Sequence, residues 1–176
     1  MKKMLFAAIA TFCCILAAQS PANLFVNGDF SKADANGKPA DWKSTSAEVV
    51  EEGVGGAKVL RLTAVNEVKT GFKGTVITQI PKLTPGKFLL KGEVKGNTTG
   101  LWLVLGFDNN LAGAKFTKWF SLPSNALKKD ENGWAKFELE VEAPAGTARG
   151  MFVLEAFHGE KDSCTDLANF FLTEIK

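Results

Sequence analysis

Apolar and polar residues alternate with a period of two along much of this chain. The odd-numbered positions from Leu101 to Phe107 are all apolar and form one row, whereas Trp102 falls on the opposite side. Successive side chains of a β-strand point to opposite faces, and a core needs only one apolar row. Trp102 is therefore either presented on a second face or covered by further protein.

Similar alternating runs recur between breaks rich in glycine or proline, and helical periodicity is almost absent. The runs predict ten strands, near residues 24–26, 47–51, 58–64, 75–80, 87–95, 101–107, 116–122, 134–141, 150–157 and 168–175. Many short strands at this spacing are typical of two packed antiparallel sheets. The expected fold class is all-β, a two-sheet antiparallel β-sandwich.

The strands at 101–107 and 116–122 are predicted to form a hairpin. Pairing Val104 with Trp119 keeps the apolar rows of both strands on one side. The same register sets Trp102 opposite Ser121. Trp102 and Trp119 then become diagonal neighbours, about 7–8 Å apart, on one outward face.

The start of the chain has the features of a secretory signal peptide. Lys2 and Lys3 give a positive start, an apolar stretch runs to Ala18, and small residues follow at Ser20 and Ala22. Cleavage after Ala22 fits these small positions best, and cleavage after Ala18 is the alternative. We expect residues 1–22 to be the signal peptide and residues 23–176 to form one domain.

Removal of the signal peptide changes both the net charge and the number of cysteines. Of 21 Lys and Arg residues, Lys2 and Lys3 leave with it, so 19 cations face 19 Asp and Glu residues and the formal net charge is zero. Cys164 remains as the one cysteine, which excludes an intramolecular disulfide. Without a basic cluster or a long apolar run, we expect no nucleic-acid binding and no membrane insertion.

The expected cellular location follows from the predicted signal peptide. Cys13 and Cys14 lie inside the signal and lack the sequence context of a lipoprotein anchor. The mature chain is therefore expected to be secreted, periplasmic or at the cell surface, without a lipid anchor.

Five phrases of the mature chain match one known pattern. They are NLFVNGDF at 23–30, GKPADW at 37–42, QIPKLTPGKF at 79–88, WAKF at 134–137 and ANFFLTEI at 168–175. In this order they resemble the CenC-like carbohydrate-binding modules, a cellulose- and xylan-binding type. The resemblance implies a jelly roll of the galactose-binding-like type that binds polysaccharide along the concave face of one sheet.

The resemblance also implies a structural calcium ion near the chain ends, but here the sequence departs from the pattern. Ser31 stands where a glutamate usually follows the NG-x-F phrase, and the usual acidic position of the last strand falls on Ala168 or Asn169. Calcium prefers several hard oxygen ligands, including carboxylates. The remaining candidate ligands are Asp29, Asn169 and backbone carbonyls.

The four tryptophans divide into two pairs. The resemblance places Trp42 and Trp134 beneath the sheets, in the core, and leaves Trp102 and Trp119 without a packing role. An indole ring offers a large, rigid apolar area, against which the C–H groups of a sugar ring can stack. We therefore take Trp102 and Trp119 as candidate sugar-binding residues.

Polar partners for a sugar must share the face of these tryptophans. Gln79 and Glu155 do so by parity, because each alternates with a neighbouring apolar residue of its strand. A solvated or cross-strand structural role is the alternative for both.

Catalysis has little support in the sequence. His158 and Cys164 are separated by a turn-like loop, and no pattern of orienting residues accompanies them. The expected function is a non-catalytic, exported carbohydrate-binding module that recognises a poly- or oligosaccharide and works beside an envelope or enzyme partner protein.

The alternative is a structural or protein-interaction module of the cell envelope, in which the same tryptophan face meets protein or packs beneath a loop. The solvent exposure of Trp102 and Trp119 separates the two hypotheses. Solvent-open tryptophans beside polar walls favour a sugar, whereas a flat apolar patch favours a protein partner.

Overall fold

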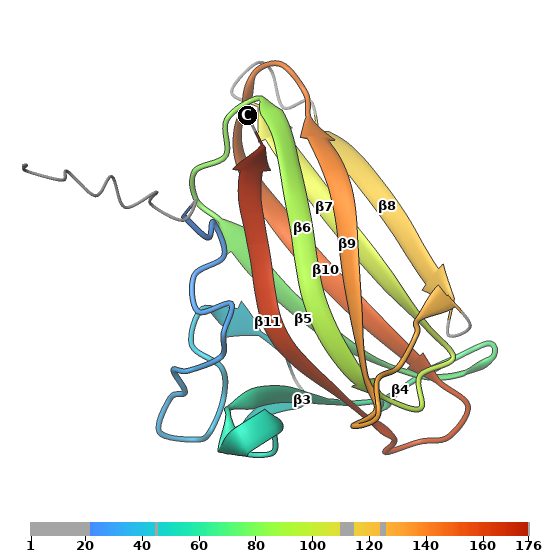
Figure 1. The fold of residues 1–176 in the computed structure, drawn as a ribbon. Coiled ribbons are helices and arrows are strands. Elements are labelled where there is room, and N and C mark those ends of the chain that lie inside the picture. The colour runs from blue at the N-terminus through green and yellow to red at the C-terminus, as the bar shows by residue number, and fades with distance from the viewer. Residues whose placement is uncertain (1–21, 45, 110–114, 124–125, 176) are drawn as a thin grey trace, which may run out of the picture.

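The computed structural model describes residues 22–44, 46–109, 115–123 and 126–175. Apart from Ala22, the predicted signal peptide lies outside these residues. Within them, eleven strands and one short 3₁₀ helix, η1 (Val54–Gly56), form two antiparallel sheets packed face to face (Figure 1). None of the described helices is long and apolar enough to cross a membrane.

The six-stranded sheet has the order β1-β5-β10-β7-β8, with β4 beside β5. Its strands are β1 (Trp42–Lys43), β4 (Asn66–Val68), β5 (Gly71–Ile80), β7 (Gly100–Asn109), β8 (Lys115–Pro123) and β10 (Thr147–His158). The five-stranded sheet has the order β2-β3-β11-β6-β9. Its strands are β2 (Ala47–Val50), β3 (Val59–Thr63), β6 (Gly86–Gly96), β9 (Trp134–Ala143) and β11 (Cys164–Ile175). The predicted all-β, two-sheet sandwich is confirmed.

Nine of the ten predicted strands coincide with strands of the structure. The prediction of a strand at residues 24–26 is wrong, because this segment is a series of bends and turns. Leu24 donates its amide to the Leu172 carbonyl of β11 (2.9 Å), and Asn27 then turns the chain at a positive φ of 54°. The apolar residues of this segment reflect packing, since Phe25 is buried in the core.

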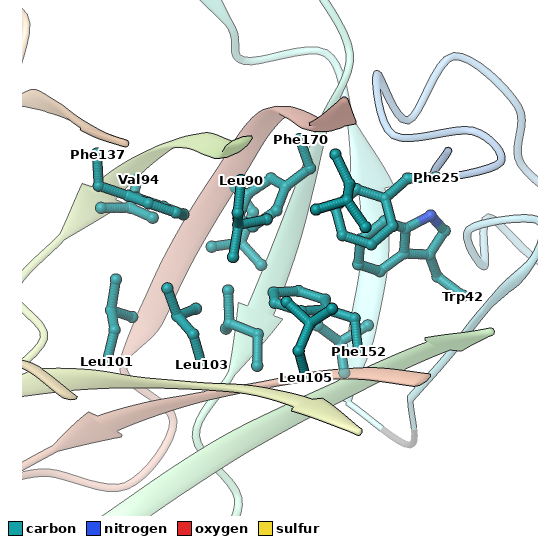
Figure 2. Close-up of a cluster of buried hydrophobic side chains, with 14 of the residues drawn as sticks. Phe25, Trp42, Leu90, Val94, Leu101, Leu103, Leu105, Phe137, Phe152 and Phe170 are labelled. Carbon is teal, nitrogen blue, oxygen red and sulfur yellow. The ribbon is translucent and has the colours of Figure 1, made fainter. Parts of the chain in front are cut away.

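The core lies between the sheets, where each sheet contributes the inward row of its alternating strands. Figure 2 shows Leu101, Leu103 and Leu105 of β7 pointing toward Leu90 and Val94 of β6 across the sandwich. All five side chains are buried. Aromatic rings fill other parts of the same layer, and Phe170 lies among them, with ring centroids 5.7–6.0 Å from those of Phe30, Trp42, Phe137 and Phe152.

A bulge in β11 decides which phenylalanine enters this cluster. Strict alternation from the buried Leu167 would turn Phe171 inward and leave Phe170 outside. The register of β11 against β6 shifts between Ala168 and Phe171, and Asn169 takes a positive φ of 53° there, a conformation that Asn tolerates better than most residues. As a result Phe170 is fully buried and Phe171 is 38% exposed.

Trp42 and Trp134 are both buried, as predicted, but only Trp42 lies in the main core. Trp134 packs in a separate small cluster with Val59 and Ala168. Ala135 belongs to the main core, so its neighbour Trp134 points to the outward side of the five-stranded sheet. The prediction that Trp134 is buried is therefore confirmed, whereas the prediction that it packs between the sheets is wrong.

The bulge allows a test with two neighbouring phenylalanines. Phe170→Ala should lower the free energy of unfolding by about 3–5 kcal/mol, because it removes a fully enclosed ring from the centre of the core. Phe171→Ala, the matched control, should cost about 1 kcal/mol or less, since its ring is partly in water. Urea unfolding followed by circular dichroism measures both, and equal losses would show that the bulge does not sort the two rings as described.

Candidate functional site

The outward side chains of the six-stranded sheet form a surface that we call the aromatic face. The register of β5, β10, β7 and β8 arranges them in rows that cross the sheet. The first row is Thr75, Glu155, Trp102 and Ser121; the second is Ile77, Val153, Val104 and Trp119; the third is Gln79, Met151, Gly106 and Thr117. Side chains from strands far apart in the sequence therefore meet on one surface.

The predicted hairpin register is confirmed. Val104 pairs with Trp119 and Trp102 pairs with Ser121. Trp102 is 45% exposed and Trp119 is 62% exposed, so both indoles stand on the aromatic face in contact with solvent. Their ring centroids are 6.3 Å apart and their planes are perpendicular, at 90°.

Phe157 of β10 extends this aromatic surface on the other side of Trp102. Its ring centroid is 5.0 Å from that of Trp102, with the planes tilted by 55°. The ammonium of Lys73, on β5, lies 6.0 Å from the Phe157 centroid, near the limit for a cation–π contact. Sequence reasoning missed Phe157, although its parity with Glu155 in the same strand was a signal that it shares this face.

Glu155 is held by an ion pair. Its carboxylate accepts a hydrogen bond from the Lys73 ammonium of the neighbouring strand, and both side chains are mostly buried. The pair cancels the charge of each partner and fixes the Glu155 carboxylate beside Trp102, its partner in the β7 register. Sequence reasoning named Glu155 and missed Lys73, because β5 and β10 are far apart in the chain.

These residues surround a hollow of about 500 Å³, which we call the Trp102 hollow. Trp102 and Phe157 supply its apolar side, while its polar walls include Thr70, Lys73, Ser121 and Glu155. Aromatic surface beside a few convergent polar groups is the usual composition of a small-molecule site.

The structure places Gln79 at the other end of the aromatic face. Gln79 pairs with Met151, whereas Glu155 pairs with Thr75, four positions away along β5. This separation is about 13 Å in an extended strand, so the structure does not bring the two predicted polar residues together. Gln79 instead lines a second hollow, of about 360 Å³, with Asp108 among its other walls.

The outward face of the five-stranded sheet has a different character. Ion pairs join Lys91 to Glu138 (2.7 Å) and Lys136 to Glu93 (3.3 Å) across β6 and β9. On β3, hydrogen bonds to Asp166 and Glu52 raise the pKa of Arg61. This face carries several paired charges. The exposed tryptophans lie on the six-stranded sheet instead, which is therefore the candidate binding surface.

Among the contacts of the described residues, His158 and Cys164 do not pair with each other as base and nucleophile. The His158 Nε2 atom lies 2.8 Å from the Thr165 hydroxyl, and the imidazole is buried. The exposed Cys164 thiol lies 3.7 Å from the Thr63 hydroxyl. Burial lowers the pKa of His158.

The candidate calcium ligands lie near each other in the fold. Phe170 donates its amide to the Gly28 carbonyl (2.9 Å), which brings the neighbouring residues Asp29 and Asn169 to the same region. The Asp29 carboxylate accepts hydrogen bonds from the amide and hydroxyl of Ser31 (3.2 and 3.0 Å). Among the described residues, no three His, Cys, Asp or Glu side chains gather as a metal-ligand set. Calcium binding stays a prediction from the resemblance.

Comparison with solved structures identifies the architecture. The "Family 16 Carbohydrate Binding Module-2" matches with a TM-score of 0.61 and 16% identity, over 86% of this chain and 100% of that one. The CBM22-1 xylan-binding domain of Xyn10C from Paenibacillus barcinonensis matches with a TM-score of 0.58 and 16% identity, over 91% and 99%. This chain has the fold of carbohydrate-binding modules. The identities are too low to carry function across.

One further match comes from a larger protein. The enzymatically active domain of tailspike protein 4 from bacteriophage CBA120 gives a TM-score of 0.61 and 16% identity over 87% of this chain. The present chain spans 21% of that tailspike chain. No protein-family model and no curated protein matches the sequence.

The burial of His158 predicts a pH-dependent stability. The folded protein holds the imidazole neutral, because its pKa is lowered, whereas the unfolded chain binds a proton near pH 6.5. Stability is therefore full above this pH and falls as the pH drops below it. His158→Gln, which cannot titrate, should show a shallower loss between pH 7 and pH 5. Urea unfolding at several pH values measures both slopes, and equal slopes would contradict the assignment.

The exposure of the tryptophans predicts their response to a quencher. Replacing Trp102 and Trp119 together by Phe should remove most of the acrylamide-quenchable fluorescence, because the remaining Trp42 and Trp134 are buried. Trp134→Phe is the control and should leave the quenchable part in place. A double variant that is quenched as readily as the parent protein would mean that the aromatic face is covered in solution.

Proposed function

We propose that this chain is a carbohydrate-binding module that holds a poly- or oligosaccharide on the aromatic face. The observation that carries the proposal is the Trp102 hollow, where exposed aromatic surface stands beside polar walls. A sugar ring has the matching chemistry, since its faces carry apolar C–H groups and its edge carries hydroxyls. The fold shared with carbohydrate-binding modules supports the same conclusion.

Each group has a distinct role in this proposal. Trp102 and Trp119 stack on sugar rings, and Phe157 widens the apolar surface at Trp102. Glu155 accepts hydrogen bonds from sugar hydroxyls, while its ion pair with Lys73 holds the carboxylate in place. Gln79 supplies a polar contact at the far end of the face.

The shape of the site favours a sugar over a flat protein partner. A protein-docking patch is typically broad and apolar, whereas Trp102 borders a hollow with hydroxyl, ammonium and carboxylate groups. The proposal also includes export of residues 23–176, after removal of the signal at 1–22, to the periplasm, the cell surface or the medium. An enzyme or envelope protein that acts on the same polysaccharide is the proposed partner.

We propose that the module does not itself cleave sugars. Glycosidases use two carboxyl groups about 5–9.5 Å apart. Glu155 and Asp108, which stand on the aromatic face, are six register positions apart, about 20 Å in an extended strand. Each is also paired with a cation, Lys73 or Arg149.

Glycan binding tests this function directly. The probes are xylohexaose and β-1,4-galactotriose, which are bound in solved structures of similar fold, together with soluble xylan in affinity gels. Trp102→Ala and Trp119→Ala should each weaken the affinity of the glycan that binds by at least about tenfold, because exposed aromatic anchors carry much of the energy of such sites.

The matched control is Phe171→Ala, which removes an exposed aromatic ring from the opposite sheet. It should leave the affinity unchanged. If none of these glycans binds, or if the control weakens binding as much as the tryptophan variants, the aromatic face is not a sugar site.

A further inference from the structure

The second hollow of the aromatic face contains one of the predicted ligand-binding residues, Gln79. We call it the Gly106 hollow. It has a volume of about 360 Å³, and its walls include Gln79, Gly106, Asp108, Thr117, Arg149 and Met151. It lies at the opposite end of β7 from the Trp102 hollow, so the two hollows share one face and are separated along the strands.

Gly106 opens this hollow. It occupies an outward position of β7, between Met151 of β10 and Thr117 of β8, where any other residue would place a side chain over the sheet. A Cβ atom built there would lie 3.8 Å from the Met151 carbonyl oxygen and 3.9 Å from the Met151 methyl carbon, which is ordinary contact. The backbone therefore does not require glycine at this position. What the glycine provides is space on the surface.

The walls of the Gly106 hollow suit an uncharged polar ligand. Gln79 offers an amide and Thr117 a hydroxyl, while Met151 supplies exposed apolar surface. The charges at its end cancel, because the Arg149 Nε atom donates to the Asp108 carboxylate (2.8 Å). In the Trp102 hollow Lys73 is likewise paired to Glu155, and the exposed Lys69 adds a further cation to its lining. Within the described part of the chain, neither lining holds an unpaired carboxylate, so both hollows fit the hydroxyl groups of a neutral sugar.

Trp119 stands between the two hollows. It belongs to the row that separates the Trp102 row from the Gly106 row. Because its ring is perpendicular to that of Trp102, the two indoles cannot stack on one flat sugar ring or on two coplanar ones. They must contact different parts of a ligand. A chain that runs from the Trp102 hollow to the Gly106 hollow passes Trp119 on its way.

From these observations we propose that the Gly106 hollow is a second subsite of the same glycan site, and that a neutral oligosaccharide lies lengthwise along β7 and β8. The two subsites span β7 from Gly100 to Asp108, about 26 Å in an extended strand, so the ligand has several sugar units. Gly106 is the residue that determines this length preference. The inference rests on the proposed sugar-binding function.

Two glycine variants test the proposal. Gly106→Val fills the second subsite. Gly100→Val fills the Trp102 hollow, where a Cβ would lie 3.6 Å from the Leu122 carbonyl oxygen and is likewise tolerated. Titration calorimetry with xylohexaose and xylotriose, and with the β-1,4-galactose hexamer and trimer, measures the affinity of each protein.

For the series that binds, the hexamer should bind the parent protein at least about tenfold more tightly than the trimer, equivalent to about 1.4 kcal/mol. Gly106→Val should weaken the hexamer by about tenfold and leave the trimer within about twofold, because a short chain occupies the Trp102 hollow. Gly100→Val should weaken both.

The outcomes separate this inference from the proposed function. If Gly106→Val leaves the hexamer affinity unchanged, the second subsite is overturned while the sugar site stands. The same holds if the parent protein binds trimer and hexamer equally. If no glycan of either series binds the parent protein, both proposals fail. Thermal melting confirms that each variant is folded. Should Gly106→Val not fold, Gln79→Ala combined with Thr117→Ala takes its place, with a loss of about fivefold expected for the hexamer alone.

Discussion

The two sheets pack face to face over one apolar core, in which Phe170 contacts Phe30, Trp42, Phe137 and Phe152, and burial of one side of each strand in this core sets which side chains face outward. A strand that sends one residue into the core must send its neighbours out. On β7, the buried Leu101, Leu103 and Leu105 therefore fix Trp102 on the aromatic face. The site is in this sense the outward side of strands whose inward side forms the core.

The distribution of charge distinguishes the two surfaces of the sandwich. On the five-stranded sheet, ion pairs such as Lys91 with Glu138 lie among exposed polar side chains, and exposed pairs of this kind contribute little to stability. On the aromatic face, the Lys73–Glu155 pair borders a hollow and stands beside aromatic rings. A carboxylate in an ion pair can still accept hydrogen bonds, while the pair as a whole has no net charge. This arrangement suits a ligand that is polar and neutral.

The fold alone says little about which ligand is bound. Sandwiches of this kind serve many functions, and structures at 16% identity show that a chain can keep the architecture while nearly all side chains change. Particular residues favour a sugar instead: two exposed indoles, a neighbouring phenylalanine and two hollows that each hold a paired carboxylate. Gly106 adds a feature of a different kind, since the absence of a side chain shapes the surface there.

Local alternation in the sequence determined nine of the strands, the inward and outward sides of β7 and β8 and the hairpin register that pairs Val104 with Trp119. These properties depend on residues near each other in the chain. The tertiary structure alone decided that Phe157 and Lys73 join Trp102 and Glu155, and that Gln79 belongs to the other hollow, because β10 inserts between β5 and β7 in the sheet. It also decided the perpendicular setting of the two indoles. Side-chain angles and neighbours across non-consecutive strands depend on sheet order, which no local pattern encodes.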